Sequence, residues 1–248
     1  MAERYSLSYD IHTHTAYSHG KGTILDNVAA ADRAGLRTIG ISDHGPGHFL
    51  FGMRMEHIAQ MRHDIAAAEG LYPGIGILLG AEANICNLSG VLDISADQIR
   101  LFDYIIAGYH FGVFGQEPVR SLGVMAGGYI HNLTGRSSVR ARNHNTDMVV
   151  ASLHANPVRV LTHPGDKIAV DIDAVAKACE ETGTLMEINR RHNGLSVESI
   201  QTAMKYDVRF IIGSDAHRPS DVGNCVNAVA RANAASLDLS RIVNLVDK

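Results

Sequence analysis

The sequence predicts one α/β domain folded as a barrel of seven strand–helix units. Short apolar runs alternate with amphipathic stretches from one end of the chain to the other, which is typical of a parallel sheet covered by helices. The chain has 248 residues, of which 46% are hydrophobic, and no Gly/Ser-rich or charged linker divides it. A barrel related to the TIM barrel fits both the length and the number of units, and an open doubly wound sheet is the alternative.

The strands are predicted where apolar runs are bounded by turn residues. In chain order these runs are "LSYDI", "RTIGIS", "GIGILLGAE", "DYIIAG", "VRVLTH", "TLMEIN" and "RFIIGSD", at residues 7–11, 37–42, 74–82, 103–108, 158–163, 184–189 and 209–215. Helices are predicted where apolar residues recur at helical spacing, at residues 23–35, 54–70, 95–102, 146–157, 171–183, 196–207, 221–233 and 238–246. Thr23 is a suitable N-cap for the first helix, and Gly35 is a suitable end.

One long segment, from about Phe111 to Asn145, lacks clear periodicity and is predicted as an irregular insertion. It has no acidic residue between Glu117 and Asp147, and its basic residues are Arg120, His131, Arg136, Arg140, Arg142 and His144. It leaves the barrel beside the strand ends, so we predict a basic, bendable lid that attracts an anionic substrate. A solvated or oligomer-forming excursion is the alternative, and a homo-oligomer is left open.

The composition excludes several classes of partner. The formal net charge of −4 gives no basic footprint for stable nucleic-acid binding. The first residues, "MAERYSLSYD", contain no apolar segment of a signal peptide, and no apolar run approaches the roughly 20 residues of a membrane span. The three cysteines are scattered, so no disulfide framework is expected. A cytoplasmic protein without membrane contact is the simplest prediction.

Polar side chains follow every predicted strand. In a parallel barrel these strand ends converge on the face that carries the chemistry. The chain has 14 histidines, and those at strand ends are accompanied by carboxylates and an amide. In chain order the strand-end residues are His12, His14, His19, Asp43, His44, Glu82, His110, His163, Glu187, Asn189, Asp215 and His217. We expect these side chains to meet at one site.

The number and chemistry of these groups indicate a metal centre. Alternation along a strand sends His12 and His14 to the same side, so both can bind one ion. Seven histidines with one glutamate and one aspartate are too many ligands for one ion, and three ions fit better than two. Imidazole and carboxylate ligands without thiolate favour Zn, Mn or Fe. His48, His57, His63 and His154 fall in a loop or on helices and are predicted to be structural.

The motifs at the strand ends resemble those of the polymerase-and-histidinol-phosphatase (PHP) family, and in particular its stand-alone phosphatases. The matching pieces run from about residue 8 to 223 and are "DIHTHT" with His19, "ISDHGPGH", "GAEAN", "AGYH", "LTHPG", "MEIN" and "GSDAH". The resemblance implies a distorted (βα)7 barrel with three metal ions. It assigns His12, His14, Glu82 and Asp215 to the first ion and His19, His44 and His217 to the second. Glu82 then bridges to the third, which His110 and His163 also hold.

A metal-dependent phosphoesterase follows from this reading. We expect a phosphomonoesterase that hydrolyses a small phosphorylated metabolite by attack of metal-bound hydroxide on phosphorus. Glu82, Asp215 and His217 are the predicted catalytic residues. Arg191, Arg218 and Asn189 are predicted to bind substrate, and Arg190 and His192 are further candidates. Asp43 and Glu187, like Asn189, are expected to orient ligands.

Three other functions are weighed against this prediction. A phosphodiesterase or nuclease acting on short nucleotides would use the same metal chemistry. A metal-dependent amidohydrolase also uses an H-x-H pair and a late aspartate on a barrel, but it leaves His19, His44 and His217 unused. A structural or regulatory module is disfavoured, because the ligand set is intact in this short chain.

Overall fold

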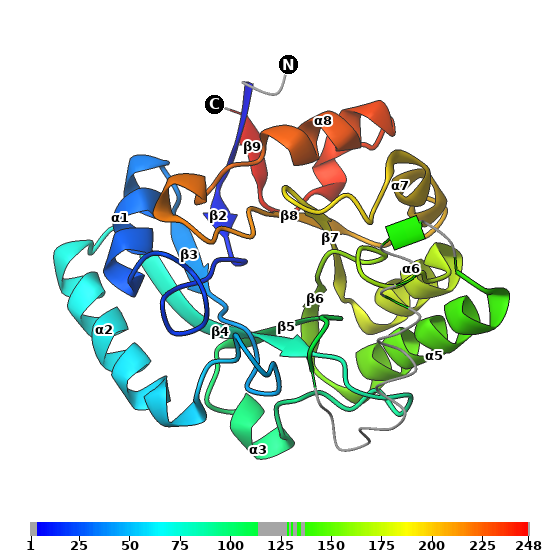
Figure 1. The fold of residues 1–248 in the computed structure, drawn as a ribbon. Coiled ribbons are helices and arrows are strands. Elements are labelled where there is room, and N and C mark those ends of the chain that lie inside the picture. Colours follow the sequence, from blue (N-terminus) through cyan, green and yellow to red (C-terminus); the bar gives the residue numbers. More distant parts are fainter. Residues whose placement is uncertain (1–3, 114–127, 129, 131–132, 135–136, 248) are drawn as a thin grey trace.

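The computed structural model describes residues 4–113, 128, 130, 133–134 and 137–247, and its strands surround a centre with the helices outside (Figure 1). Seven strands form one sheet in the order β2-β3-β4-β5-β6-β7-β8, and each neighbouring pair is parallel. They are β2 (Tyr9–Asp10), β3 (Thr38–Ile41), β4 (Gly76–Asn84), β5 (Tyr104–Gly108), β6 (Val158–Leu161), β7 (Leu185–Asn189) and β8 (Phe210–Gly213). All seven overlap the predicted runs, so the parallel α/β architecture is confirmed.

The sheet closes into a barrel instead of opening into a doubly wound sheet. Its strand order follows the chain order without the reversal that creates a switch point in a doubly wound fold. Its two ends meet just beyond β2 and β8, where Thr13 and Ala216 form a parallel bridge. His14 N donates to Ala216 O at 2.8 Å, and Ala216 N donates to His12 O at 3.3 Å. The closure therefore involves the segments that carry the first and last predicted ligands.

Helices cover the outside of the barrel (Figure 1). They are α1 (Ile24–Arg33), α2 (Ile58–Leu71), α3 (Ala96–Ile99), α5 (Val139–Ala155), α6 (Ile172–Thr182), α7 (Val197–Ala203) and α8 (Val226–Ala234). Thr23 caps α1 through a capping box with Asp26, and Gly35 follows the helix with φ of 73°. Both predicted boundary residues are confirmed, whereas α3 is shorter than the predicted helix 95–102.

Helix α5 begins at Val139, well before the predicted start at residue 146. The predicted irregular insertion is therefore wrong over its last residues. Ser138 caps the helix by accepting from Ala141 N at 3.1 Å, and the buried face near its start is polar, so apolar periodicity did not reveal it. There Asn145 Nδ2 donates to Ala169 O at 3.0 Å, and Thr146 Oγ1 accepts from Asp171 N at 2.8 Å. Polar hydrogen bonds thus replace the expected apolar contacts.

Three basic residues of the predicted lid consequently lie on α5: Arg140, Arg142 and His144. The other three lie outside the described residues: Arg120, His131 and Arg136.

The C-terminal residues form a strand where a helix was predicted over 238–246. A 3₁₀ turn, η4 (Leu239–Arg241), precedes β9 (Leu245–Asp247), which pairs antiparallel with β1 (Tyr5–Leu7). Asn244, which is fully buried and lies in the chain between η4 and β9, explains why no helix forms here. Its side chain accepts from Ile212 N at 3.0 Å and donates to Ile212 O at 2.8 Å and Tyr9 O at 2.9 Å. These bonds tie the chain to both β8 and β2, and a helix could not supply them.

The interior of the barrel is filled below the strand ends. Tyr104 OH donates to Ile11 O at 2.9 Å across the barrel. A Cβ on Gly40 would lie 2.1 Å from the Tyr104 hydroxyl, and one on Gly80 would lie 2.2 Å from its ring, so both positions require glycine. Because side chains two residues apart share a face, Glu82 points to the same inner side as the missing side chain of Gly80. Tyr104 therefore forms the layer beneath Glu82.

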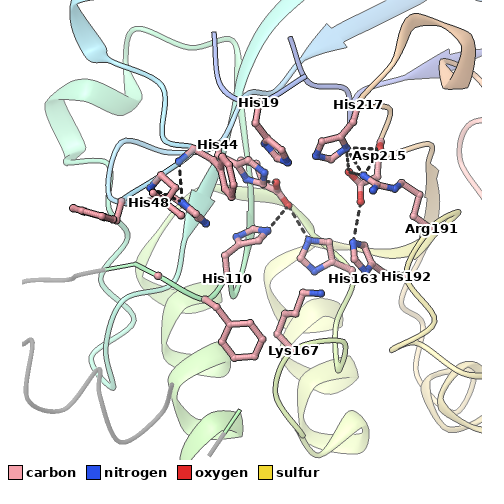
Figure 2. A pocket seen from close by; sticks show the side chains of 16 residues that line it. His19, His44, His48, His110, His163, Lys167, Arg191, His192, Asp215 and His217 are labelled. Carbon is pink, nitrogen blue, oxygen red and sulfur yellow. Dashed lines mark hydrogen bonds and ion pairs between the residues drawn. The ribbon is translucent and has the colours of Figure 1, made fainter. Parts of the chain in front are cut away.

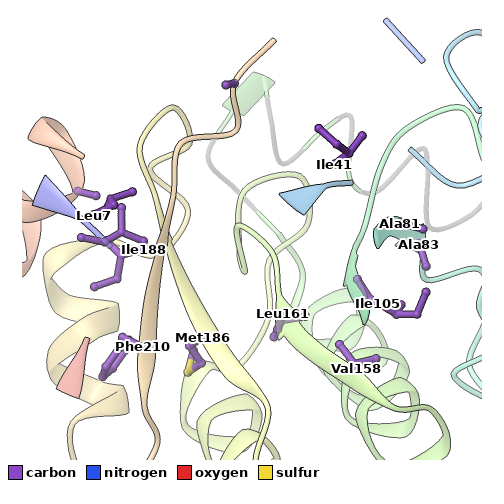
Figure 3. Packing of buried hydrophobic residues seen from close by; sticks show 14 of the residues in the cluster. Leu7, Ile41, Ala81, Ala83, Ile105, Val158, Leu161, Met186, Ile188 and Phe210 are labelled. Atoms are coloured by element: carbon purple, nitrogen blue, oxygen red, sulfur yellow. The ribbon is translucent and has the colours of Figure 1, made fainter. Parts of the chain in front are cut away.

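The main apolar core lies between the sheet and the helices. Figure 3 shows Ile105, Val158, Leu161 and Met186 on successive strands, and all belong to one buried cluster. This packing fixes the strand ends and thereby holds the side chains of the site in position. Among the described residues, no helix has the length and apolarity that crossing a membrane requires.

Candidate metal centre

All nine predicted metal ligands gather at the carboxyl ends of the strands, around a pocket of about 630 Å³. Figure 2 shows His19, His44, His110, His163 and His217 converging on this cavity together with Asp215. His12 and His14 lie beneath it and are 2% and 0% exposed. The convergence that the sequence predicted is thus present in the geometry.

Glu82 is the centre of this arrangement. Its side chain is fully buried, and it lines the pocket from β4. Nitrogen atoms of five histidines lie within 3.6 Å of its oxygens: His12 at 3.3 Å, His14 at 3.6 Å, His44 at 2.9 Å, His110 at 3.4 Å and His163 at 2.9 Å. One carboxylate shared by so many imidazoles has the position of a bridging ligand.

Asp215 is the second carboxylate and follows β8, across the barrel seam from His12 and His14. Its Oδ1 lies 3.8 Å from His12 Nε2, 3.4 Å from His14 Nε2 and 3.2 Å from His217 Nδ1. Asp215 has φ of 51° and His163 has φ of 32°. Left-handed backbone is costly for such residues and is typically found at functional sites.

Three overlapping groups of these side chains could each hold an ion. The ligand atoms within each group lie within 4.8 Å of one another, and the groups are His12, His14 and Asp215; His14, His44 and His217; and His44, Glu82 and His110. The other two predicted ligands are close by. The rings of His19 and His217 have centroids 4.2 Å apart, and His163 Nε2 lies 2.9 Å from Glu82.

Unsatisfied buried atoms show that this set fits metal ions. In the described part of the chain, buried atoms without a hydrogen-bond partner include His12 Nε2, both ring nitrogens of His14 and His19 Nδ1. His44 Nδ1 and Glu82 Oε2 lie 2.9 Å apart as an ion pair but without hydrogen-bond geometry. A buried polar atom without a partner costs free energy. Ions bound to these lone pairs would remove that cost.

The electrostatics of the site favour the protonation states that metal ligands need. Burial alone would raise the pKa of Glu82, but His110, His12 and His44 hold it well below its usual value. Burial, reinforced by His44, lowers the pKa of His14 well below its usual range. Burial, followed by His217 and His44, lowers the pKa of His19 to about 3. Glu82 is thereby ionised, and His14 and His19 are neutral.

His12 is the exception to this pattern. Burial opposes its charge, but Glu187, Glu82 and Asp215 together raise its pKa well above the usual value. Its Nδ1 donates to Glu187 Oε1 at 2.6 Å. This bond fixes the ring so that Nε2 faces Glu82 and Asp215, which is the usual arrangement of a carboxylate, a histidine and a metal.

The polar residues around the ligands hold them in place, as expected for Asp43, Glu187 and Asn189. Asp43 accepts from Thr15 N at 2.7 Å and from Thr15 Oγ1 at 2.6 Å, and thereby fixes the loop between His14 and His19. Asn189 donates to Glu187 Oε2 at 2.9 Å and to Asp215 Oδ2 at 3.4 Å. Asn189 is 1% exposed and does not line the pocket, so its contacts are those of a positioning residue.

The other expected substrate residues differ in position. Arg191 lines the pocket, and its Nη1 lies 3.5 Å from Asp215 Oδ1. Arg218 is exposed and does not line the pocket, and Arg190 is paired with Asp221 at 3.1 Å. His192 lines the pocket and lies 3.0 Å from Asp166 and 3.3 Å from Asp215.

Sequence reasoning missed two groups of residues at the site. Lys167 lines the pocket and enters it opposite the upper histidines (Figure 2), and its position four residues after His163 was the available signal. Asn84 accepts from His110 Nδ1 at 2.7 Å, and Asp93 in turn accepts from Asn84 N at 2.7 Å. Asn84 stands in the quoted "GAEAN" motif, but nothing in the sequence links Asp93 to it.

Comparison with known families matches residues 10–191 to the PHP domain and residues 197–241 to the PHP-associated segment. The chain belongs to the PHP family. A probable phosphatase of a Shewanella species is 30% identical over 250 residues, with 95% of this chain and 86% of that protein covered. A probable phosphatase of Shewanella amazonensis is 28% identical with the same coverage. The predicted family is thus confirmed, and Asp215 and His217 lie in the region matched to the PHP-associated segment.

Two solved structures resemble the chain at low identity. One is histidinol phosphate phosphatase from Lactococcus lactis in complex with zinc, L-histidinol and phosphate, with 13% identity, a TM-score of 0.49, and 92% of this chain and 91% of that chain covered. The other is a putative metal-dependent phosphoesterase from Bifidobacterium adolescentis, with 16% identity, a TM-score of 0.47, and 95% and 96% covered.

Proposed function

We propose that this protein is a metal-dependent phosphomonoesterase that acts on a small phosphorylated metabolite. Family membership and the probable phosphatases among its relatives support hydrolysis of a phosphate ester. The observation that carries the proposal is the buried Glu82 carboxylate with five imidazoles around it. We also propose that the whole chain is one domain, because one continuous sheet spans both matched segments.

The proposed cofactor is a set of three divalent ions of Zn, Mn or Fe. His12, His14, Glu82 and Asp215 hold the first ion, and His19, His44 and His217 hold the second. His110 and His163 hold the third together with Glu82. The cluster of His12, His14 and Asp215 and the buried atoms without partners support the first of these sets. His14 and His44 each belong to two clusters, so the proposed ions would be close neighbours. The ligands are imidazoles and carboxylates, which suit these metals.

When bound, such ions lower the pKa of a coordinated water toward about 7 and offset the negative charge of phosphoryl oxygens. The protein supplies position and charge. Glu82, Asp215 and His217 border the place where the phosphoryl group lies, and are the proposed catalytic residues. Arg191 and Lys167 bring two cations to the same pocket and attract the phosphate dianion.

The structure weighs against the amidohydrolase alternative. That reading leaves His19, His44 and His217 without a role, yet His44 and His217 join His14 in one candidate ion site. His19 packs against both of them, with ring centroids 4.9 Å from His44 and 4.2 Å from His217. These three histidines therefore belong to the same centre as the others.

The test compares Glu82→Gln and His163→Ala with the wild-type protein, using Glu69→Gln on the exposed surface of α2 as a matched control. Each protein is purified without chelator, checked for folding by circular dichroism and assayed with an aryl phosphate. We expect Glu82→Gln to lose activity at least 100-fold, at least as much as His163→Ala, because Glu82 serves two ions. Near-normal turnover in Glu82→Gln contradicts the proposed bridge. A metal-loaded wild-type protein that hydrolyses no phosphomonoester refutes the function.

A further inference from the structure

The pocket above the metal ligands is lined by two chemically different sets of side chains. Histidines, Asp215, Lys167 and Arg191 form the polar set, and their labelled side chains surround the cavity in Figure 2. The apolar set, which we call the apolar rim, consists of four side chains: Phe49, Leu50, Phe51 and Phe111. A phosphate group is attracted by the polar set, whereas the apolar rim offers nothing to a charged group.

The backbone that carries the apolar rim is fixed by hydrogen bonds. His48 Nδ1 accepts from Leu50 N at 3.3 Å and from Phe51 N at 3.1 Å. Phe49 N donates to Gly112 O at 3.0 Å, and His48 forms a bridge with Val113. The loop beside β3 and the segment after β5 are thus joined, so the apolar rim is built into the structure.

One member of the apolar rim is largely open to solvent. Leu50 is 71% exposed, although a large apolar side chain at a pocket mouth gains free energy when it is covered. Phe51 packs against two histidines of the pocket, with its ring centroid 4.5 Å from that of His19 and 5.0 Å from that of His48. The apolar rim therefore begins directly at the ligand set.

We infer that the apolar rim binds the leaving group of the substrate, and that this leaving group carries an apolar or aromatic ring. The inference rests on the proposed phosphomonoesterase function. With the phosphoryl group over the metal ligands and beside Arg191 and Lys167, the leaving group attached through the ester oxygen extends toward the apolar rim. The enzyme thus prefers phosphomonoesters of ring-bearing alcohols over those of small polyols.

The test uses two alkyl phosphates with nearly the same reacting centre, 2-phenylethyl phosphate and 2-hydroxyethyl phosphate. The wild-type protein prefers the phenyl ester in kcat/KM by at least about tenfold. Leu50→Ser lowers this preference about three- to tenfold through KM, as expected for losing one covered aliphatic side chain. Leu71→Ser is the matched control, because Leu71 is 66% exposed on α2 and does not line the pocket.

A second measurement separates this inference from the proposed function. Calorimetry compares binding of the non-hydrolysable 3-phenylpropylphosphonate and 3-hydroxypropylphosphonate to the same proteins. Tighter binding of the phenyl compound, weakened by Leu50→Ser, supports the apolar rim even where turnover fails. Hydrolysis of both esters with equal kcat/KM, or equal affinity for both phosphonates, overturns the inference and leaves the phosphatase standing. A change in oligomeric state of Leu50→Ser on light scattering, with unchanged substrate preference, makes the apolar rim an interface between copies instead.

Discussion

Replacing Glu187 by glutamine tests whether the ligand set depends on the residues that orient it. Glu187 is 1% exposed and does not border the pocket. Its Oε1 accepts from His12 Nδ1 at 2.6 Å, and its Oε2 accepts from His163 N at 2.8 Å and Asn189 Nδ2 at 2.9 Å. Glutamine keeps the shape of the side chain but removes the charge, and its amide nitrogen cannot accept from these donors.

The expected loss of metal affinity in Glu187→Gln follows from the role of carboxylates that bind a ligating histidine. A carboxylate on the far nitrogen of a ligating histidine typically changes metal affinity 10- to 100-fold, which corresponds to about 1.4–2.7 kcal/mol. The short distance between His12 and Glu187, and the burial of both, favour the upper half of this range. Activity falls at limiting metal and recovers when excess Zn or Mn is supplied, because Glu187 does not touch the substrate.

The assay titrates metal against a competing chelator and measures phosphatase activity at each free-metal concentration. Glu181→Gln is the matched control, because Glu181 also pairs with a histidine, His154, at 3.3 Å, but on the exposed surface. Its metal affinity stays at the wild-type value. Unchanged metal affinity in Glu187→Gln refutes the reasoning. Activity that is lost with metal binding intact, and is not recovered by excess metal, also refutes it.

Three further predictions follow from the same geometry. Elemental analysis of protein purified without chelator finds about three ions of Zn, Mn or Fe per chain, and a single site after metal supplementation contradicts the trinuclear centre. In chelator-treated protein, burial lowers the pKa of His192, but bonds to Asp166 and Asp215 dominate and raise it to about 9. The raised value stabilises the fold below pH 6.5, by roughly 2–3 kcal/mol, and this contribution is lost as pH rises through 9. Denaturant unfolding of wild-type and His192→Gln protein at pH 6 and pH 10 checks this. If the two proteins differ by the same free energy of unfolding at both pH values, the prediction is rejected. Replacing Arg140 and Arg142 together by alanine leaves kcat/KM within about twofold, since neither lines the pocket, and a selective loss with highly charged substrates restores their place in a substrate-reading lid.

The sequence predicted the positions of the ligands because their placement depends only on strand order. Each strand is an apolar run, and most of the predicted ligands lie at or just after the end of a run, so a parallel barrel brings them together whatever the details of the helices. Glu82 near the end of β4 and His163 after β6 illustrate this, since 81 positions separate them in the chain but their side chains lie 2.9 Å apart.

Other features depend on contacts that leave no periodic signal. The start of α5 is stabilised by buried Asn145 and Thr146, which a search for apolar spacing passes over. Arg231 of α8 donates to His192 O at 3.1 Å and to Asn189 O, and thereby holds the turn that carries Arg191. Only the folded chain reveals that a helix near the C-terminus supports the pocket wall.

The seam of the barrel connects metal binding to the stability of the fold. His12 and His14 lie on one side of the seam and Asp215 and His217 on the other, and two backbone hydrogen bonds to Ala216 join the sides at this end. An ion bound by the proposed ligands His12, His14 and Asp215 would therefore link the first and last strands of the sheet. Any ion that binds only the folded state stabilises it by RT ln(1 + [metal]/Kd), and here it would also relieve buried atoms that lack partners. Under the proposed function, the same residues would both prepare the site for phosphate chemistry and hold the barrel closed.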